Sequence, residues 1–184
     1  MASVERPAPR IRPATREDVP AIDELIARSA RALSGGYYSA TQIESLLRWV
    51  FGTDTQLIDD GTYFVVEQDQ QLLGAGGWSR RRTLFGGDRM KEHEDPLLDP
   101  RSEPARIRAF FMDPGAARQG LGRRLFDQCR SAAAAAGFHT LTLVATLPGE
   151  PLYQALGFTV TERFQLHLPD QVDVPVARMN RGVA

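Results

Sequence analysis

The segment from Phe110 to Gly137 restricts the possible folds of this chain more than any other. It continues an apolar strand, predicted over Arg106–Met112, that is stopped by Asp113-Pro114-Gly115, a strong turn signal. A helix is predicted to begin near Gly120, because apolar residues then recur every three or four positions up to Ala136. The glycine that closes the segment is expected to end this helix in a left-handed conformation. The pattern therefore predicts a strand, a glycine-bearing turn and a helix in direct succession.

The start of this helix has the chemistry of a phosphate site. The first turn of any helix carries unpaired N–H groups and a partial positive charge. Gly120 and Gly122 lack the Cβ atoms that would hold a ligand away from those groups. Arg118, Arg123 and Arg124 add formal positive charge. The combination indicates a phosphorylated ligand, and the simpler alternative is that the two glycines serve only the geometry of the turn.

Two common phosphate-binding motifs do not fit this turn. A P-loop needs Lys-Ser or Lys-Thr after its second glycine, whereas Arg123-Arg124 follows Gly122. A dinucleotide-binding turn needs a third glycine and an acidic residue at the end of the next strand. The third glycine is missing, and the next strand, predicted over residues 138–146, ends without an acid.

Two blocks of the sequence resemble the GNAT superfamily of acetyl-CoA-dependent N-acetyltransferases. Residues 117–122, Ala-Arg-Gln-Gly-Leu-Gly, are similar to the pyrophosphate loop Gln/Arg-x-x-Gly-x-Gly/Ala, although Ala117 stands where Gln or Arg is usual. Residues 153–158, Tyr-Gln-Ala-Leu-Gly-Phe, are similar to the Tyr-x-x-x-Gly-Phe block. The resemblance implies an α/β (α+β) fold with a central mixed, mostly antiparallel, twisted sheet of about seven strands flanked by about four helices.

The resemblance also implies a ligand and its contacts. Acetyl-CoA is expected as co-substrate, with its pantetheine arm paired to the backbone before the loop and its pyrophosphate on the loop itself. By this resemblance Tyr153 is the general acid. A phenol with a pKa of about 10 can protonate a leaving thiolate whose thiol has a pKa of about 8.5, and the alternative for Tyr153 is a core position. The expected contacts are Phe110, Phe111, Met112, Arg118, Gln119, Gly120, Leu121, Gly122 and Arg123.

The acceptor side is less defined. The resemblance places the first two helices beside the acceptor pocket, so Tyr37, Tyr38 and Trp78 are candidate substrate contacts, with core packing as the alternative for each. An alkyl amine with a pKa of about 10.4 must lose a proton before it attacks. Many family members place a glutamate on the central strand for this step, but residues 106–109 offer none. Glu103 and the group Glu92, His93 and Glu94 are the candidates, and an arylamine would need no base.

The remaining elements follow from periodicity and turn signals. Thr15 and Ser39 or Thr41 are expected to cap the first two helices, and the segment 80–104 is a long irregular loop. Pro175 indicates that the last strand lies at an edge or starts late. Residues 1–9 are expected to form a loose tail and 10–184 a single domain. The other predicted elements are a strand at 10–14, a hairpin at 63–67 and 71–79, a short helix around Tyr153 and a hairpin at 158–168 and 174–180.

Composition narrows the classes of function. The 184 residues carry a formal net charge of −1, which disfavours a general nucleic-acid binder. The single cysteine, Cys129, excludes an internal disulfide or a cysteine metal cluster, and we expect no metal. No apolar stretch is long enough to cross a membrane, so a cytoplasmic location is expected. The predicted partner is a small-molecule or protein amine, and assembly as a homodimer stays open. The alternative functions are a CoA-binding sensor without turnover and an acyltransferase for a longer acyl-CoA.

Overall fold

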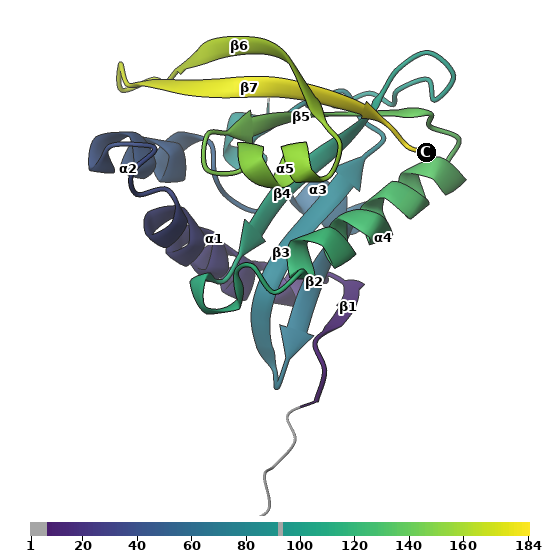
Figure 1. Ribbon diagram of the computed structural model, residues 1–184, viewed down its shortest axis with the longest axis horizontal. Coiled ribbons are helices and arrows are strands. Elements are labelled where there is room, and N and C mark those ends of the chain that lie inside the picture. Colours follow the sequence, from purple (N-terminus) through teal and green to yellow (C-terminus); the bar gives the residue numbers. More distant parts are fainter. Residues whose placement is uncertain (1–6, 92–93) are drawn as a thin grey trace, which may run out of the picture.

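The computed structural model describes residues 7–91 and 94–184, so six residues of the expected N-terminal tail, and Glu92 and His93, lie outside the described residues. Within the described residues, seven strands and five α-helices are formed (Figure 1). They are β1 (Arg10–Pro13), α1 (Val19–Leu33), α2 (Ala40–Trp49), α3 (Thr55–Asp59), β2 (Tyr63–Gln68), β3 (Gln71–Ser79), β4 (Ala105–Met112), α4 (Leu121–Ala135), β5 (Thr140–Thr146), α5 (Glu150–Ala155), β6 (Thr159–His167) and β7 (Asp173–Gly182).

The strands form one mixed sheet in the order β1-β2-β3-β4-β5-β7-β6. Only β4 and β5 are parallel, and the other neighbours are antiparallel. The predicted fold class is therefore confirmed. The sequence had suggested about four helices, and the additional one is α3, whose five residues are too few to show a helical period.

The sheet separates two main cores, and β2 shows how. Side chains alternate between the two faces of a strand. Phe64 and Val66 accordingly pack with the apolar stripe of α4, whereas Tyr63 and Val65 pack with α1 and α3. All four residues are buried, so β2 reads as a continuous apolar run rather than an alternating one.

The helix ends follow the predicted signals. Ser39 caps α2, since its hydroxyl accepts a hydrogen bond of 3.2 Å from the Gln42 N–H. Thr15 and Asp18 form the expected capping box, here around a single 3-10 turn that leads into α1. At the far end of α4, Gly137 has a φ of 90°, the left-handed stop that the sequence predicted.

The strands β4 and β5 diverge, and this divergence organises the molecule. They pair only at Ala105–Leu141 and Arg106–Thr142. From Ile107 onward β4 pairs with β3 alone. A register shift in β3 between Ala75 and Gly77, opposite a positive φ of 53° at Ala109, bends β4 as it leaves its parallel neighbour.

Glycines of β3 make room for side chains of β4. A Cβ atom on Gly76 would lie 2.6 Å from the Phe110 ring, and one on Gly74 would lie 2.6 Å from the Met112 methyl group. Such distances are impossible for a real Cβ, so both positions require glycine unless the neighbour moves. Close packing between β3 and β4 therefore accounts for both glycines.

The position of β7 corrects one expectation. The strand lies between β5 and β6, so of the two alternatives for Pro175, an edge position and a late start, the edge position is wrong. Pro175 is nevertheless tolerated, because it is paired only with Gln165 of β6. Pairing with β5 begins one residue later, at Val176. At Pro175 the strand therefore has a neighbour on one side only, which is the situation that proline permits.

Candidate active site

The turn before α4 has the open geometry of a ligand cradle. Gly120 is the N-cap of α4 with a φ of 78°, a left-handed conformation that favours glycine. A Cβ atom at this position would meet no other atom within 4 Å. Gly122 differs, since a Cβ there would lie 3.4 Å from Leu152 of α5. Gly120 thus leaves space on the outside of the turn, and Gly122 allows α5 to approach the helix.

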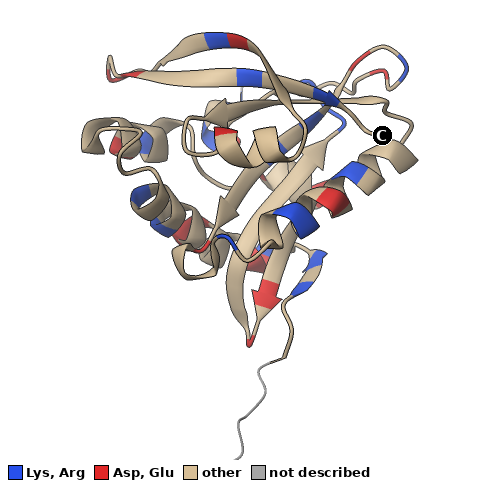
Figure 2. Cartoon of the chain, viewed as in Figure 1, with Lys and Arg blue, Asp and Glu red and all other residues tan. Residues whose placement is uncertain are grey.

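The N–H groups of this turn are available. Along the described chain, no backbone hydrogen bond is donated by residues 118–123, and the first one of the helix runs from the Arg124 N–H to the Gly120 carbonyl. Figure 2 shows positive residues in the loop before α4 and at the start of the helix. Arg118, Gln119 and Arg123 are exposed, and Leu121 is buried beneath them. The turn thus presents unpaired donors together with positive charge, as a phosphate site requires.

A cavity of about 230 Å³ fills the divergence between β4 and β5. It reaches both faces of the sheet, since α5 contributes residues on one side and α1 and α2 contribute them on the other. Its walls include Ser29, Ala30, Leu33, Ser34, Leu46, Val50, Phe51, residues 84–87, residues 107–112, Val144, Thr146, Pro148, Gly149, Leu152, Tyr153, Leu166 and Val176.

Tyr153 lines this cavity from α5, and only 9% of its surface is exposed. Its ring lies edge-on to Phe110, with 6.3 Å between ring centroids, and to Phe158, with 5.8 Å. Burial raises the pKa of the Tyr153 phenol, so the hydroxyl is protonated at neutral pH. No partner for this hydroxyl is found in the described part of the chain, which leaves it free to bond a group in the cavity.

The free edge of β4 carries unused backbone groups. Successive residues of a strand direct their N–H and C=O groups to opposite edges. The Asp113 N–H bonds the Leu73 carbonyl at 2.9 Å, so Asp113 faces β3. Met112 therefore directs its N–H and C=O toward the divergence from β5. The structure thus brings Phe110, Phe111 and Met112 together with Tyr153 around one cavity.

The three predicted acceptor contacts lie elsewhere, and none lines the cavity. Tyr38 is buried, with its hydroxyl donating to the Pro175 carbonyl at 2.7 Å and accepting from the Leu147 N–H at 2.9 Å. Burial raises its pKa to about 12. Trp78 packs edge-on to Phe138 in the core, and Tyr37 is 51% exposed. For Tyr38 and Trp78 the structure thus shows core packing, the alternative that the sequence left open.

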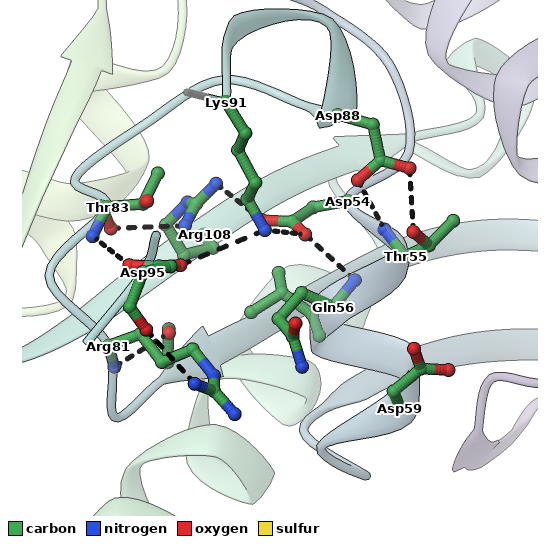
Figure 3. A network of polar contacts seen from close by, with 12 residues as sticks. Asp54, Thr55, Gln56, Asp59, Arg81, Thr83, Asp88, Lys91, Asp95 and Arg108 are labelled. Carbon is green, nitrogen blue, oxygen red and sulfur yellow. Dashed lines mark hydrogen bonds and ion pairs between the residues drawn. The ribbon is translucent and has the colours of Figure 1, made fainter. Parts of the chain in front are cut away.

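A buried ion pair, not predicted from the sequence, borders the cavity instead (Figure 3). Arg108 of β4 lines the cavity, and 1% of its side chain is exposed. Its Nη2 atom lies 2.9 Å from Oδ2 of Asp54, whose side chain is fully buried. Lys91 contacts the second carboxylate oxygen of Asp54. Burial lowers the pKa of Arg108 and the charge of Asp54 opposes that effect.

This ion pair fixes the segment that closes the acceptor side of the cavity. Arg108 also donates to the Thr83 carbonyl at 3.1 Å and to the Gly86 carbonyl. Asp54 in turn caps α3, accepting from the Gln56 N–H at 3.0 Å. A usable signal was present in the sequence: an arginine at an inward position of an apolar strand requires a buried acidic partner. The identity of that partner, 54 residues away, required the fold.

Ionisable groups are scarce around the cavity. Among the described residues that line it, only Arg108 and Tyr153 have ionisable side chains, and the Arg108 guanidinium stays charged. Glu103, a candidate base, instead accepts from the Asp99 N–H at 2.8 Å and lies 3.6 Å from Arg82. Glu94 is exposed, and Glu92 and His93 fall outside the described residues. Over residues 7–91 and 94–184, no cluster of potential metal ligands and no helix able to cross a membrane is found.

Comparison with known proteins identifies one matching family. The profile of the Acetyltransferase (GNAT) family matches residues 22–158. No curated protein matches the chain significantly.

Solved structures share the fold along nearly the whole chain. A GCN5-related N-acetyltransferase from Rhodopseudomonas palustris has a TM-score of 0.70 at 16% identity, covering 98% of this chain and 99% of that one. PaiA N-acetyltransferase from Thermoplasma acidophilum, solved with coenzyme A, has a TM-score of 0.64 at 15% identity, with 95% and 99% covered. The protein yncA of Salmonella typhimurium, described as a candidate acetyltransferase, was solved with acetyl-CoA. It has a TM-score of 0.63 at 17% identity, covering 97% of this chain and 95% of that one. At these identities the likeness concerns the fold.

Proposed function

Because this chain belongs to the Acetyltransferase (GNAT) family, we propose that it transfers an acetyl group from acetyl-CoA to a primary amine within a ternary complex. The observation that carries the proposal is the position of Tyr153. Its protonated hydroxyl, which has no hydrogen-bond partner among the described residues, lines a cavity in the divergence between β4 and β5 whose walls are mostly apolar.

The residues around the turn and cavity fit acetyl-CoA. The free N–H groups at residues 118–123 and the side chains of Arg118 and Arg123 suit a pyrophosphate. The open edge of β4 at Met112 supplies backbone groups for the amides of a pantetheine arm, as an added strand would. Ala117 offers no side-chain contact, and a cradle made of backbone groups needs none.

The reaction is direct acyl transfer. The neutral amine nitrogen attacks the thioester carbonyl, the C–N bond forms and the C–S bond breaks. The nitrogen loses one proton and the sulfur takes up one proton. Tyr153 donates the hydrogen bond that supports this proton uptake. Burial raises the pKa of the Tyr153 phenol, and the same burial would raise the pKa of a thiol bound in the cavity. The Met112 N–H is available to polarise the carbonyl oxygen.

The test is release of free thiol from acetyl-CoA in the presence of a panel of primary amines. Tyr153→Phe is expected to lower kcat by about 100-fold, the usual contribution of a general acid, while acetyl-CoA binding persists. Tyr37→Phe is the matched control, because Tyr37 lies outside the cavity and is half exposed. An unchanged rate in Tyr153→Phe would refute the role of this residue.

Two further measurements separate the other classes of function. Calorimetry of acetyl-CoA with Gly120→Glu tests the turn, since a carboxylate there should block an anion by bulk and charge. Tight binding to the parent protein without thiol release from any amine would favour a sensor. Faster release from propionyl-CoA or succinyl-CoA than from acetyl-CoA would favour a longer acyl donor.

A further inference from the structure

Two arginines lie on the face of the sheet that carries Val144 and Arg108 of the cavity wall, and a third arginine lies near them. The register places Arg106 of β4 opposite Thr142 of β5, and Arg178 of β7 opposite Val144, two residues further along β5. Paired residues share a face, so Arg106 and Arg178 point to the same side as Val144. Val144 lines the cavity, as does Arg108, the next residue of β4 on that face. Arg106 and Arg178 therefore lie next to lining residues of the cavity, and Arg82 is close enough for its charge to act on Arg106. We call Arg82, Arg106 and Arg178 the arginine cluster.

The charge of this cluster is incompletely balanced. Arg82 lies 3.6 Å from Glu103, and Arg178 lies 3.5 Å from Glu162. In the described part of the chain neither pair forms a hydrogen bond, and no carboxylate lies within 4 Å of the Arg106 guanidinium. Burial lowers the pKa of Arg106, Glu103 opposes this, and the charges of Arg178, Arg108 and Arg82 lower it further. Three cations thus face two carboxylates.

The cluster also contains unused donors. The Nε atoms of Arg106 and Arg178 are buried and have no hydrogen-bond partner within the described chain. The single hydrogen bond of the Arg106 side chain joins Nη1 to the Pro104 carbonyl at 2.9 Å. A buried donor without an acceptor costs free energy, so such groups call for a partner.

We propose that the arginine cluster binds a carboxylate on the acceptor, so that the preferred acceptor is an amine with an apolar body and a carboxylate group. The planar fork of a guanidinium matches a carboxylate in geometry, and the pair gains from charge. The apolar body suits the neighbouring chamber formed by residues such as Leu33, Phe85 and Leu166. This assignment rests on the proposed acetyltransferase function.

The experiment compares 4-(aminomethyl)benzoate with 4-(aminomethyl)benzamide, which differ in charge far from the amine. Calorimetry measures the binding of each probe to the parent protein in the presence of CoA, and thiol release from acetyl-CoA measures turnover. The carboxylate probe is expected to bind about 10-fold more tightly than the carboxamide, as a charge-assisted hydrogen bond implies. The same preference is expected in kcat/KM.

Variants of the cluster test which arginines cause the preference for the carboxylate probe. Arg178→Met should abolish it, and Arg106→Lys, which keeps the charge but loses the fork, should reduce it. The matched control is Arg16→Met, which removes an exposed arginine paired with Asp59 and should keep the full preference. Equal binding of the two probes, binding of neither, or a preference that persists in Arg178→Met would overturn the inference. Thiol release with an uncharged amine such as benzylamine would then leave the proposed function intact, whereas no release from any amine would count against both.

Discussion

Replacing Asp54 by asparagine removes the carboxylate that Arg108 and Lys91 share. The change is small in volume and keeps an oxygen that can still accept from the Gln56 N–H. It leaves the Arg108 guanidinium, which is 1% exposed, without its counter-charge in the middle of the sheet. The expected result is a protein that folds, is much less stable, and has a loosened segment around Thr83 and Gly86.

The magnitude follows from the burial of both partners. Breaking a buried ion pair by removing one partner typically costs about 3–5 kcal/mol. The lower end applies here, about 3 kcal/mol, because Lys91 is partly exposed and water can stabilise its charge. For a domain with a free energy of unfolding of about 5–15 kcal/mol, this is a large fraction of the total.

Urea unfolding of Asp54→Asn, Arg108→Met and the double variant measures the effect and its origin. Because the pair acts as a unit, the double variant should be more stable than the sum of the single losses predicts, with a coupling of at least about 1 kcal/mol. Asp59→Asn, which alters an exposed pair with Arg16, should leave the midpoint unchanged. A loss below about 1 kcal/mol in Asp54→Asn, or additive losses in the double variant, would refute the reasoning.

Three further predictions test other parts of the structure. Gly76→Ala forces a Cβ to within 2.6 Å of the Phe110 ring, so the free energy of unfolding, measured in urea, should fall by about 1–3 kcal/mol through overpacking. Calorimetry should also show weaker binding of acetyl-CoA. Cys129 is fully buried and its pKa is raised by that burial, so a thiol reagent should not modify it until the protein unfolds; rapid labelling of the native protein would contradict this. The pKa of Asp18 is lowered to about 2, chiefly by hydrogen bonds from Arg12. A lowered pKa stabilises the fold above the unfolded pKa of about 3.9 and loses that contribution as the pH falls toward 2. The urea midpoint of the parent protein should therefore fall more steeply between pH 4 and pH 2 than that of Asp18→Asn.

Local patterns predicted most of the fold. The strand over Arg106–Met112, the turn and the helix up to Gly137 follow from apolar spacing and glycine placement, which are properties of neighbouring residues. The turn at Asp69-Gln70 lies where predicted, with φ of 50° and 64°. By contrast, α3 was missed because one and a half turns show no period, and its N-cap Asp54 is recognisable only beside its partners.

The positions of the turn before α4 and of Tyr153 were more predictable from the sequence than the lining of the chamber beside α1 and α2. The phosphate-compatible turn and Tyr153 belong to two short blocks whose residues are close in sequence. The acceptor chamber is assembled from α1, α2, the segment 84–87 and β7, so its lining depends on how distant elements pack. The sequence left two roles open for Tyr38, because both hydrogen-bond partners of its hydroxyl lie more than 100 residues away in the chain.

The short pairing of β4 with β5 has a mechanical consequence. Two paired positions, Ala105–Leu141 and Arg106–Thr142, connect a block of four strands, β1 to β4, to a block of three, β5 to β7. Beyond them no strand pairing joins the two blocks within the described residues, so we expect the sheet to yield most easily along this line.

A ligand that pairs with the open edge of β4 would act as an extra strand along this line. It would couple the two blocks where the sheet itself does not, and amide protons at the C-terminal ends of β4 and β5 should then exchange with solvent more slowly. Binding of the proposed donor would in this sense stiffen the protein along the line where β4 and β5 diverge.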